Sequence, residues 1–315
     1  MSLIEKAAKR LEELRRAGVD TPGDKGGEIG TSRTVDQHEA PHPEAEPMPA
    51  ASARRANPAA PPTHGPATAP NSRQVNLDVS QLSSSGFVIP GAPRSQVAEE
   101  FRVLKIPLIA NASGKGAVPI ANGNLIMVTS ALPAEGKTFT AINLAVSIAM
   151  ELARTVLLVD ADVARPSLPK LLGVPEYPGL LDLLQNKSLT LGDALLRTNI
   201  DKFSVLPSGT PHERATELLA SAEMAGLLHE MAHRYADRII IFDSPPLLVT
   251  TEARVLASHM GQIVFVVQAE VTLQSEIMQA LATIEACPVK LMVLNQANTS
   301  SSGGYGYRYG YRYAP

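Results

Sequence analysis

Short apolar runs alternate with longer amphipathic stretches from about residue 96 onward. Most of the runs are rich in Val and Ile and apolar on both faces, which is typical of strands buried on both sides of a parallel sheet. Strands are expected at 125–130, 155–160, 203–209, 238–246, 262–268 and 290–295. Helices are expected at 137–153, 214–233, 251–259 and 271–286. This alternation predicts an α/β fold with a doubly wound, mostly parallel sheet.

The first 95 residues do not show this alternation. Residues 1–17 carry apolar side chains at spacings of three and four, which predicts a short amphipathic helix. Such a helix can be a solvated segment or a docking element, and the sequence leaves both interpretations open. Residues 18–95 are rich in Pro and Ala and, up to about residue 76, have almost no large aliphatic side chains. This composition predicts a disordered linker.

Bulk composition narrows the class of protein. Of the 315 residues 44% are hydrophobic and 19% charged, which is ordinary for a globular chain, and the net charge of −3 argues against a nucleic-acid-binding surface. The single cysteine, Cys287, excludes a disulfide framework and fits a reducing compartment. No apolar stretch approaches the roughly 20 residues of a membrane span. We therefore expect a cytoplasmic protein that reaches a membrane only through a partner.

A phosphate-binding loop is expected at 131–139, ALPAEGKTF, where a predicted strand gives way to a predicted helix. Backbone N–H groups at such a helix start point at an anion. Lys137 can reach the β- and γ-phosphates, and the Thr138 hydroxyl can ligate Mg²⁺. The expected cofactor-binding residues are Ala134, Glu135, Gly136, Lys137, Thr138 and Phe139. Because Ala131 replaces the first glycine of the usual pattern, a surface turn before an ordinary helix is the alternative interpretation.

Three aspartates stand at the ends of two predicted strands. Asp160 and Asp162 follow one strand, and Asp243 follows another. Ligands bind at the carboxyl ends of parallel strands, and carboxylates gathered there repel one another unless a cation lies among them. For any one of these aspartates taken alone, a helix cap or turn residue is the better interpretation. Together they predict a Mg²⁺–nucleotide site, with Thr138, Asp162 and Asp243 as the metal ligands.

These segments resemble the Walker A, Walker A′ and Walker B motifs of bacterial tyrosine kinases, which are P-loop autokinases of capsule and exopolysaccharide assembly. The motifs read ALPAEGKT at 131–138, Asp-x-Asp from Asp160, and DSPP from Asp243. The resemblance implies a fold of the P-loop NTPase type, with ATP and Mg²⁺ as cofactors. It also implies Lys137, Asp160 and Asp162 as catalytic residues, with Asp160 as the base or water-positioning group. The Pro-rich tether and the SLIEKA start further resemble the exosortase-associated subgroup of these kinases.

The chain ends in YGYRYGYRYAP, which has no aliphatic residue large enough to build a core. The resemblance implies a kinase domain at 96–297 and a flexible Gly/Tyr-rich tail at 298–315 that neighbouring subunits phosphorylate in trans. The implied phosphorylation sites are Tyr305, Tyr307, Tyr309, Tyr311 and Tyr313. The glycines of the tail keep it extended, and its two arginines can steer it toward an acidic site.

The chain departs from the family pattern in two places. The family has an arginine two residues after the second Walker A′ aspartate, where this chain has Ala164 followed by Arg165. The family's Glu-x-x-Arg-x-x-Arg helix joins subunits into a ring. Here Glu99, Arg102 and Lys105 take those positions, and lysine lacks the bidentate fork of arginine.

The resemblance also implies partners. These are a separate membrane chain-length regulator that activates the kinase at the inner face of the membrane, further copies of the chain in the ring, and a cognate tyrosine phosphatase. No nucleic-acid partner is expected. The implied role is to regulate exopolysaccharide or capsule polymerisation and export.

Two other functions fit parts of the sequence. A partition or division-site ATPase of the same superfamily would carry an early lysine in the phosphate loop, at the position where this chain has Leu132. An inactive nucleotide-binding module could use the Tyr/Gly/Arg tail to self-associate. That second alternative leaves Lys137, Thr138 and the three aspartates unexplained.

Overall fold

The computed structural model describes residues 73–235 and 237–297. The helix predicted at 1–17, most of the predicted linker and the tail at 298–315 lie outside the described residues. None of the helices within the described ranges combines the length and hydrophobicity that crossing a membrane requires.

An eight-stranded sheet forms the centre of the fold, in the order β1-β4-β5-β3-β6-β2-β7-β8. Neighbouring strands pair in parallel, apart from β4 and β5, which are antiparallel. The strands are β1 (Arg73–Val75), β2 (Leu125–Ser130), β3 (Thr155–Asp160), β4 (Leu196–Thr198), β5 (Phe203–Leu206), β6 (Arg238–Asp243), β7 (Gln262–Gln268) and β8 (Val289–Asn295). The predicted mostly parallel α/β sheet is therefore confirmed.

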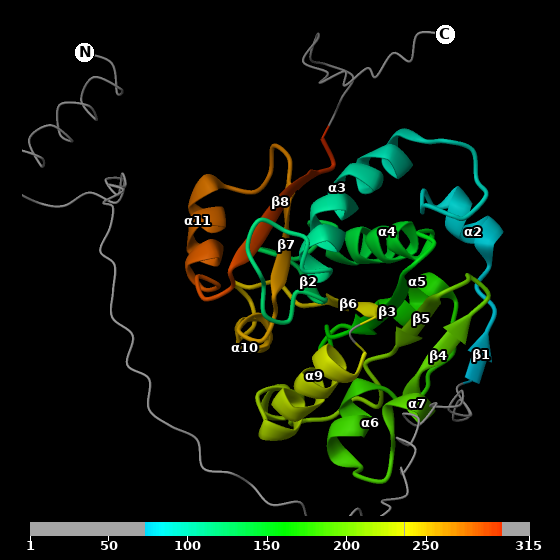
Figure 1. Ribbon diagram of the computed structural model, residues 1–315. Helices are drawn as coiled ribbons and strands as arrows, with labels where there is room; N and C mark the ends of the chain where they lie inside the picture. Colours follow the sequence, from blue (N-terminus) through cyan, green and yellow to red (C-terminus); the bar gives the residue numbers. More distant parts are fainter. Residues whose placement is uncertain (1–72, 236, 298–315) are drawn as a thin grey trace, which may run out of the picture. The chain divides into compact units, whose positions relative to one another are not determined.

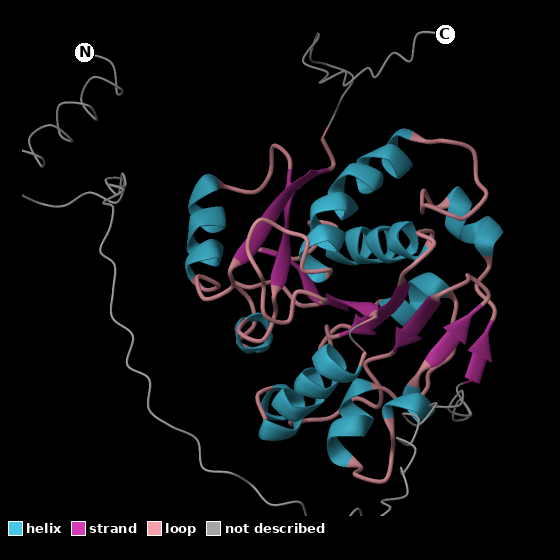
Figure 2. Cartoon of the chain, in the orientation of Figure 1, coloured by secondary structure: helices cyan, strands magenta, loops and turns pink. Residues whose placement is uncertain are grey.

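Helices cover both faces of this sheet (Figures 1 and 2). One face carries α2 (Val79–Ser84), α3 (Gln96–Ala112), α4 (Lys137–Ala149) and α5 (Leu168–Leu172). The other carries α6 (Leu180–Gln185), α7 (Leu191–Ala194), α8 (Ala215–Leu219), α9 (Ala222–Arg234), α10 (Glu252–Ala257) and α11 (Gln274–Ala282). Successive strand residues feed the two cores in turn: Leu125 and Met127 face one, and Ile126 and Val128 face the other. This is why the central strands are apolar on both faces.

Several expected elements agree with the structure and others differ. The strands at 125–130, 155–160 and 262–268 have the expected bounds. The helix expected at 214–233 is broken into α8 and α9, because the Ser221 hydroxyl accepts a hydrogen bond from Met224 N (3.2 Å) and starts a new helix. The strands β1 and β4 were not expected, since three residues are too few to show an alternating pattern.

The prediction that the linker extends to residue 95 is wrong. Strand β1 pairs with β4, and helix α2 packs Leu82 into the core. Phe87, Val88 and Ile89 are also buried, and Val88 N donates to Asn143 Oδ1 (2.6 Å). The folded domain therefore begins by Arg73, because this stretch contains enough large apolar side chains to be buried.

Candidate active site

The segment between β2 and α4 has the backbone of an anion-binding loop. Ala134 (φ 65°) and Gly136 (φ 94°) both adopt the left-handed conformation, and a Cβ on residue 136 would overlap the side chain of Asn295. No side chain caps the start of α4. The N–H groups of Lys137, Thr138 and Phe139 have no acceptor within the helix. They are therefore available to an anion at the positive end of the helix dipole.

Two of the predicted cofactor-binding side chains point elsewhere. The Glu135 carboxylate is turned inward and only 2% of the residue is exposed. The Phe139 ring packs against Phe87 and Phe101, with ring centroids 5.2 and 6.5 Å apart. For these two residues only the backbone can contact a phosphate, and their assignment as cofactor-binding residues stays a prediction. Lys137 is 8% exposed at the start of α4.

The carboxylates of Asp160 and Asp243 lie at the ends of adjacent parallel strands. The two residues are partners in the β3–β6 register, and both are fully buried. None of their four carboxylate oxygens accepts a hydrogen bond of normal distance and angle from the described residues. A buried carboxylate without a partner is costly, so this pair indicates a site built for a ligand.

The electrostatics of the pair reflect that burial. Burial raises the pKa of Asp160 to about 8, and the charges of Asp243 and then Asp162 add to the effect, while the nearby N–H groups of Leu168 and Asp162 lower the pKa. Burial likewise raises the pKa of Asp243 to about 7, although the nearby Thr138 hydroxyl and the Lys137 ammonium lower it. At neutral pH the two strand-end carboxyls are thus at least partly protonated in the protein alone. Added positive charge in the site would favour the state in which both are ionised.

Asp162 occupies the loop after β3 and is only partly buried. Burial raises its pKa, while the charge of Lys137, the N–H of Arg165 and the Arg165 guanidinium lower it. Arg165 N donates to Asp162 Oδ1 at 3.3 Å. The arginine that stands one position later than in the family pattern therefore still acts on Asp162.

The oxygens of the side chains at the carboxyl ends of β3 and β6 fit a hard cation such as Mg²⁺. Within the described residues no group of three or more His, Cys, Asp or Glu side chains gathers into a complete metal cage. Mg²⁺, however, is held by one or two carboxylates together with phosphate oxygens and water. The Thr138 hydroxyl lies 3.1 Å from Ser167 Oγ and next to Asp243. Thr138 and the strand-end aspartates can thus supply the protein's ligands to a Mg²⁺ ion. Ser167 is a neighbour of this site that the sequence analysis did not identify.

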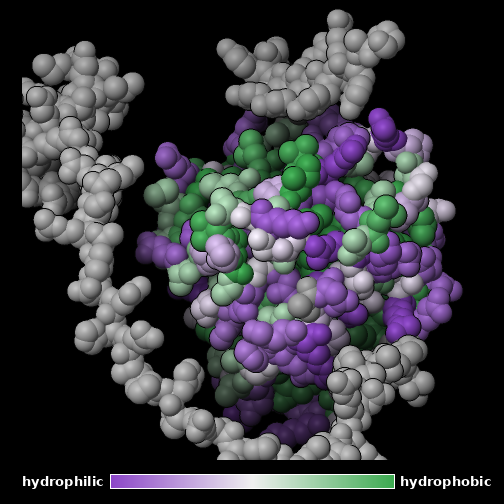
Figure 3. Space-filling model, in the orientation of Figure 1, coloured by the Kyte–Doolittle hydropathy of each residue, from purple (hydrophilic) through white to green (hydrophobic). Residues whose placement is uncertain are grey.

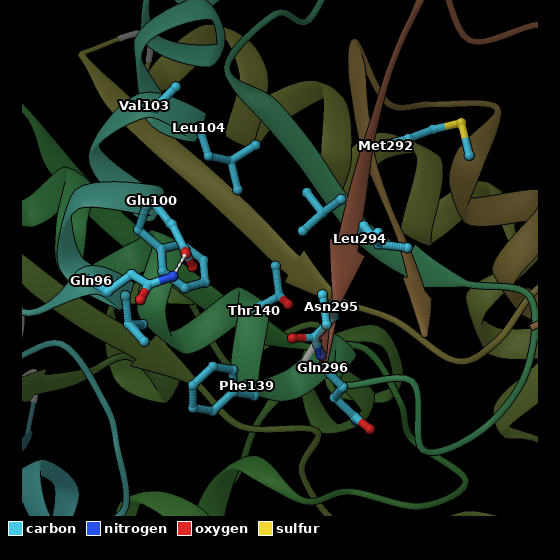
Figure 4. A pocket seen from close by; sticks show the side chains of 14 residues that line it. Gln96, Glu100, Val103, Leu104, Phe139, Thr140, Met292, Leu294, Asn295 and Gln296 are labelled. Carbon is cyan, nitrogen blue, oxygen red and sulfur yellow. Dashed lines mark hydrogen bonds between the residues drawn. The ribbon is translucent and has the colours of Figure 1, made fainter. Parts of the chain in front are cut away.

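Sequence reasoning also missed the residues that hold the loop from behind. Asn295 Nδ2 donates to Glu135 O (2.8 Å), and Gln296 Nε2 donates to Ala134 O (3.4 Å). Both amides stand at the carboxyl end of a predicted strand, which was the available signal. They also line a groove of about 570 Å³ between α3 and β8, beside Phe139 and Thr140 at the start of α4 (Figure 4).

The three residues on α3 that were predicted to contact another subunit differ in their exposure. Glu99 and Arg102 are exposed and form a 3.7 Å ion pair. Lys105 is buried; its Nζ contacts Glu151 Oε1 at 2.6 Å and donates to Ser147 O at 2.7 Å. Lys105 does not present its charge to another subunit, so this part of the prediction is wrong. Val103 and Ile106 on the same helix and Leu294 on β8 are exposed apolar residues. Figure 3 shows green, hydrophobic surface in the part of the molecule where Figure 1 labels α3 and β8.

Comparison with known proteins places this site in a family. No protein-family profile matches the chain. The tyrosine-protein kinase YwqD of Bacillus subtilis (strain 168) is 34% identical over 184 residues, which cover 58% of this chain and 76% of YwqD. The chain belongs to the bacterial tyrosine-protein kinases. CapB of Staphylococcus aureus is 28% identical over 229 residues, covering 72% of this kinase and 96% of CapB.

Solved structures agree with this assignment. The crystal structure of the chimerical protein CapA2B2 superposes with a TM-score of 0.56 at 27% identity, over 71% of this kinase and 93% of that chain. The predicted protein-tyrosine kinase activity is confirmed. The assignment to the exosortase-associated subgroup stays a prediction.

Proposed function

We propose that this kinase transfers the γ-phosphoryl group of Mg²⁺–ATP to the tyrosines of the tail of a second copy. The acceptors are Tyr305, Tyr307, Tyr309, Tyr311 and Tyr313. The observation that carries the proposal is the pair of buried carboxylates, Asp160 and Asp243, which accept no hydrogen bond of normal geometry from the described part of the chain, beside a helix start that no described side chain caps. A cation and a phosphate chain are complementary to these two features.

Different groups of the chain bind the phosphates and the metal ion during phosphoryl transfer. The N–H groups at the start of α4 and the Lys137 ammonium bind and neutralise the phosphates, and this neutralisation is the main catalytic demand of the reaction. Thr138, Asp162 and Asp243 would hold the Mg²⁺, which supplies further charge neutralisation at the β- and γ-phosphates.

Asp160 is our proposed acceptor for the phenol proton. Its pKa of about 8 in the protein alone lies close to neutral pH, as suits a general base, and positive charge in the site would favour the ionised form. Because Asp160 is fully buried, a phenol can reach it only through an ordered water or after the neighbouring Ser167–Leu168 segment shifts. Asp162 is more exposed than Asp160 and Asp243.

The biological setting we propose is regulation of capsule or exopolysaccharide polymerisation and export. In this setting a separate membrane protein activates the kinase and recruits it from the cytoplasm to the inner face of the membrane, and a cognate phosphatase reverses the reaction. Glu99 and Arg102 support the ring-forming role proposed for α3, because both are exposed on its surface. Exposed charges of this kind are worth little alone, so a ring would also need the apolar residues around them.

Mass spectrometry of a mixture of two chains tests the proposal. Wild-type protein is incubated with ATP and Mg²⁺ together with an isotope-labelled Lys137→Met chain, in the presence of membranes from the source cells. Phosphate should be found on the tail tyrosines of the labelled, inactive chain, and none should form when Lys137→Met is incubated alone. Lys187→Met, a change of an exposed lysine outside the site, should behave as wild type. Bare tail tyrosines in the wild-type reaction would overturn the proposal.

A further inference from the structure

The Glu135 carboxylate lies within the phosphate loop, immediately before Gly136 and Lys137. A negative charge there opposes the binding of an anion unless it is turned away from the ligand. The structure turns it away, since the residue is only 2% exposed. Both carboxylate oxygens are engaged, in contrast to those of Asp160 and Asp243.

One oxygen closes the loop on itself. Glu135 Oε2 accepts a hydrogen bond from Leu132 N at 2.7 Å. This bond spans the part of the loop that contains Ala134, whose left-handed conformation (φ 65°) is unusual for a residue with a Cβ. The bond therefore offsets the strain of the turn that places Gly136 and the free N–H groups at the start of α4.

The other oxygen ties the loop to a neighbouring strand. Glu135 Oε1 accepts a hydrogen bond from the Thr272 hydroxyl. That hydroxyl in turn accepts from Gln268 N at 3.1 Å, at the carboxyl end of β7. The Glu135 carbonyl also accepts from Asn295 Nδ2 at the end of β8. The phosphate loop is thus anchored to the ends of both β7 and β8.

We infer that Glu135 is a positioning residue, which holds the phosphate loop in its anion-binding shape through Leu132 and Thr272. The inference rests on the proposed binding of ATP at this loop. Glu135 does not touch the nucleotide in this role. Its buried, hydrogen-bonded carboxylate keeps the loop N–H groups and Lys137 in place, and displacement of such groups by about 1 Å can cost on the order of 100-fold in rate.

Binding of a non-hydrolysable ATP analogue with Mg²⁺ to the full chain, measured by calorimetry, tests this role. We expect Glu135→Ala to weaken binding by about 10-fold to 100-fold. Glu135→Gln should weaken it less, because its amide oxygen can still accept from Leu132 N. Thr272→Val should also weaken binding and Thr272→Ser should not. The losses in the double variant Glu135→Ala/Thr272→Val should be less than additive, since both changes break the Glu135–Thr272 hydrogen bond.

Glu276→Ala is the matched control. Glu276 Oε2 accepts from Leu273 N at 2.9 Å, so this glutamate makes the same bond to the N–H three residues earlier, but at the start of α11. Its removal should lower the Tm, as Glu135→Ala does, and leave the affinity for the analogue unchanged.

The KM for ATP should follow the affinities in activity assays. Wild-type affinity in Glu135→Ala, or equal losses in Glu135→Ala and Glu276→Ala, would overturn the positioning role. If Glu135→Ala does not fold, unchanged affinity in both Glu135→Gln and Thr272→Val would overturn it instead. Failure of the wild-type chain to bind the analogue would contradict the proposed function itself.

Discussion

Four buried charged groups of the folded domain fall into two sets that differ in their hydrogen-bond partners. Asp160 and Asp243, at the ends of β3 and β6, are fully buried, and within the described residues no group donates a hydrogen bond of normal distance and angle to them. Glu135 in the loop and Lys105 on α3 are buried as well, but each has close partners. Since a buried charge without a partner is destabilising, the difference separates groups kept for a ligand from groups that hold the protein together.

The largest effect on activity is expected from replacing the carboxylates of Asp160 and Asp243. Asp160→Asn and Asp243→Asn should each lower tail phosphorylation by about 100-fold or more, because a proton acceptor or metal ligand is lost. At pH 8 without metal, both changes should raise the Tm, by roughly 2–4 °C for each kcal/mol regained. Phosphate incorporation and thermal unfolding in EDTA measure the two effects. A lower Tm in both variants would show that the aspartates are structural.

The same aspartates predict a pH dependence of stability. Their pKa values in the folded, metal-free chain are raised to about 8 and about 7, above the value of 3.8 expected when unfolded. The folded state therefore binds more protons than the unfolded state between these limits. The stability contributed by the protonated carboxyls is fully present below about pH 4 and is lost as the pH rises to about 8. Unfolding in EDTA should show this loss, and the Asp160→Asn/Asp243→Asn double variant should show much less of it. If the free energy of unfolding fell equally steeply with pH in the wild-type chain and in the double variant, the account would be contradicted.

Removing the Glu135 carboxylate, which belongs to the second set, should lower the stability instead of raising it. Glu135→Ala leaves Leu132 N and the Thr272 hydroxyl without their acceptor, and is expected to lower the free energy of unfolding by about 1–3 kcal/mol. Urea denaturation of the metal-free chain, followed by circular dichroism, measures this change. A gain in stability would place Glu135 with the strand-end aspartates rather than opposite them.

A smaller loss of stability is expected on α3. Lys105→Met removes the ion pair with Glu151 and the hydrogen bond to Ser147 O, and should cost about 1–2 kcal/mol, because Glu151 remains half exposed and can be hydrated. Glu99→Gln breaks only an exposed ion pair and should change stability by less than about 0.5 kcal/mol. Urea denaturation of both variants compares them directly. Equal losses would show that burial of Lys105 does not matter.

The parts of the site that follow from local sequence could be predicted. Lys137 and Thr138 come directly after a strand and a loop, and Asp160 and Asp243 end their strands, so motif and position agree. The burial of Lys105 also had a local signal. It lies four residues after Phe101 and three before Leu108, on the face of α3 that packs against the core.

Contacts that depend on strand order could not be predicted in this way. Glu135 meets Thr272 and Asn295 only because β7 lies next to β2 and β8 lies next to β7, and one sequence does not specify that order. The segment at 73–95 was missed for a related reason. Its strand has three residues, and Val75 gains its burial from pairing with β4, more than 100 residues away in the chain.

Calorimetric binding of a non-hydrolysable ATP analogue, with and without Mg²⁺, tests most directly whether the loop and the strand-end aspartates form one site. The wild-type chain should bind at least about 10-fold more weakly in EDTA, because no cation then neutralises the charge of the phosphates beside the strand-end aspartates. Asp243→Asn should bind the analogue with little dependence on Mg²⁺. Equal wild-type affinity with and without Mg²⁺, or an unchanged Mg²⁺ dependence in Asp243→Asn, would contradict the account.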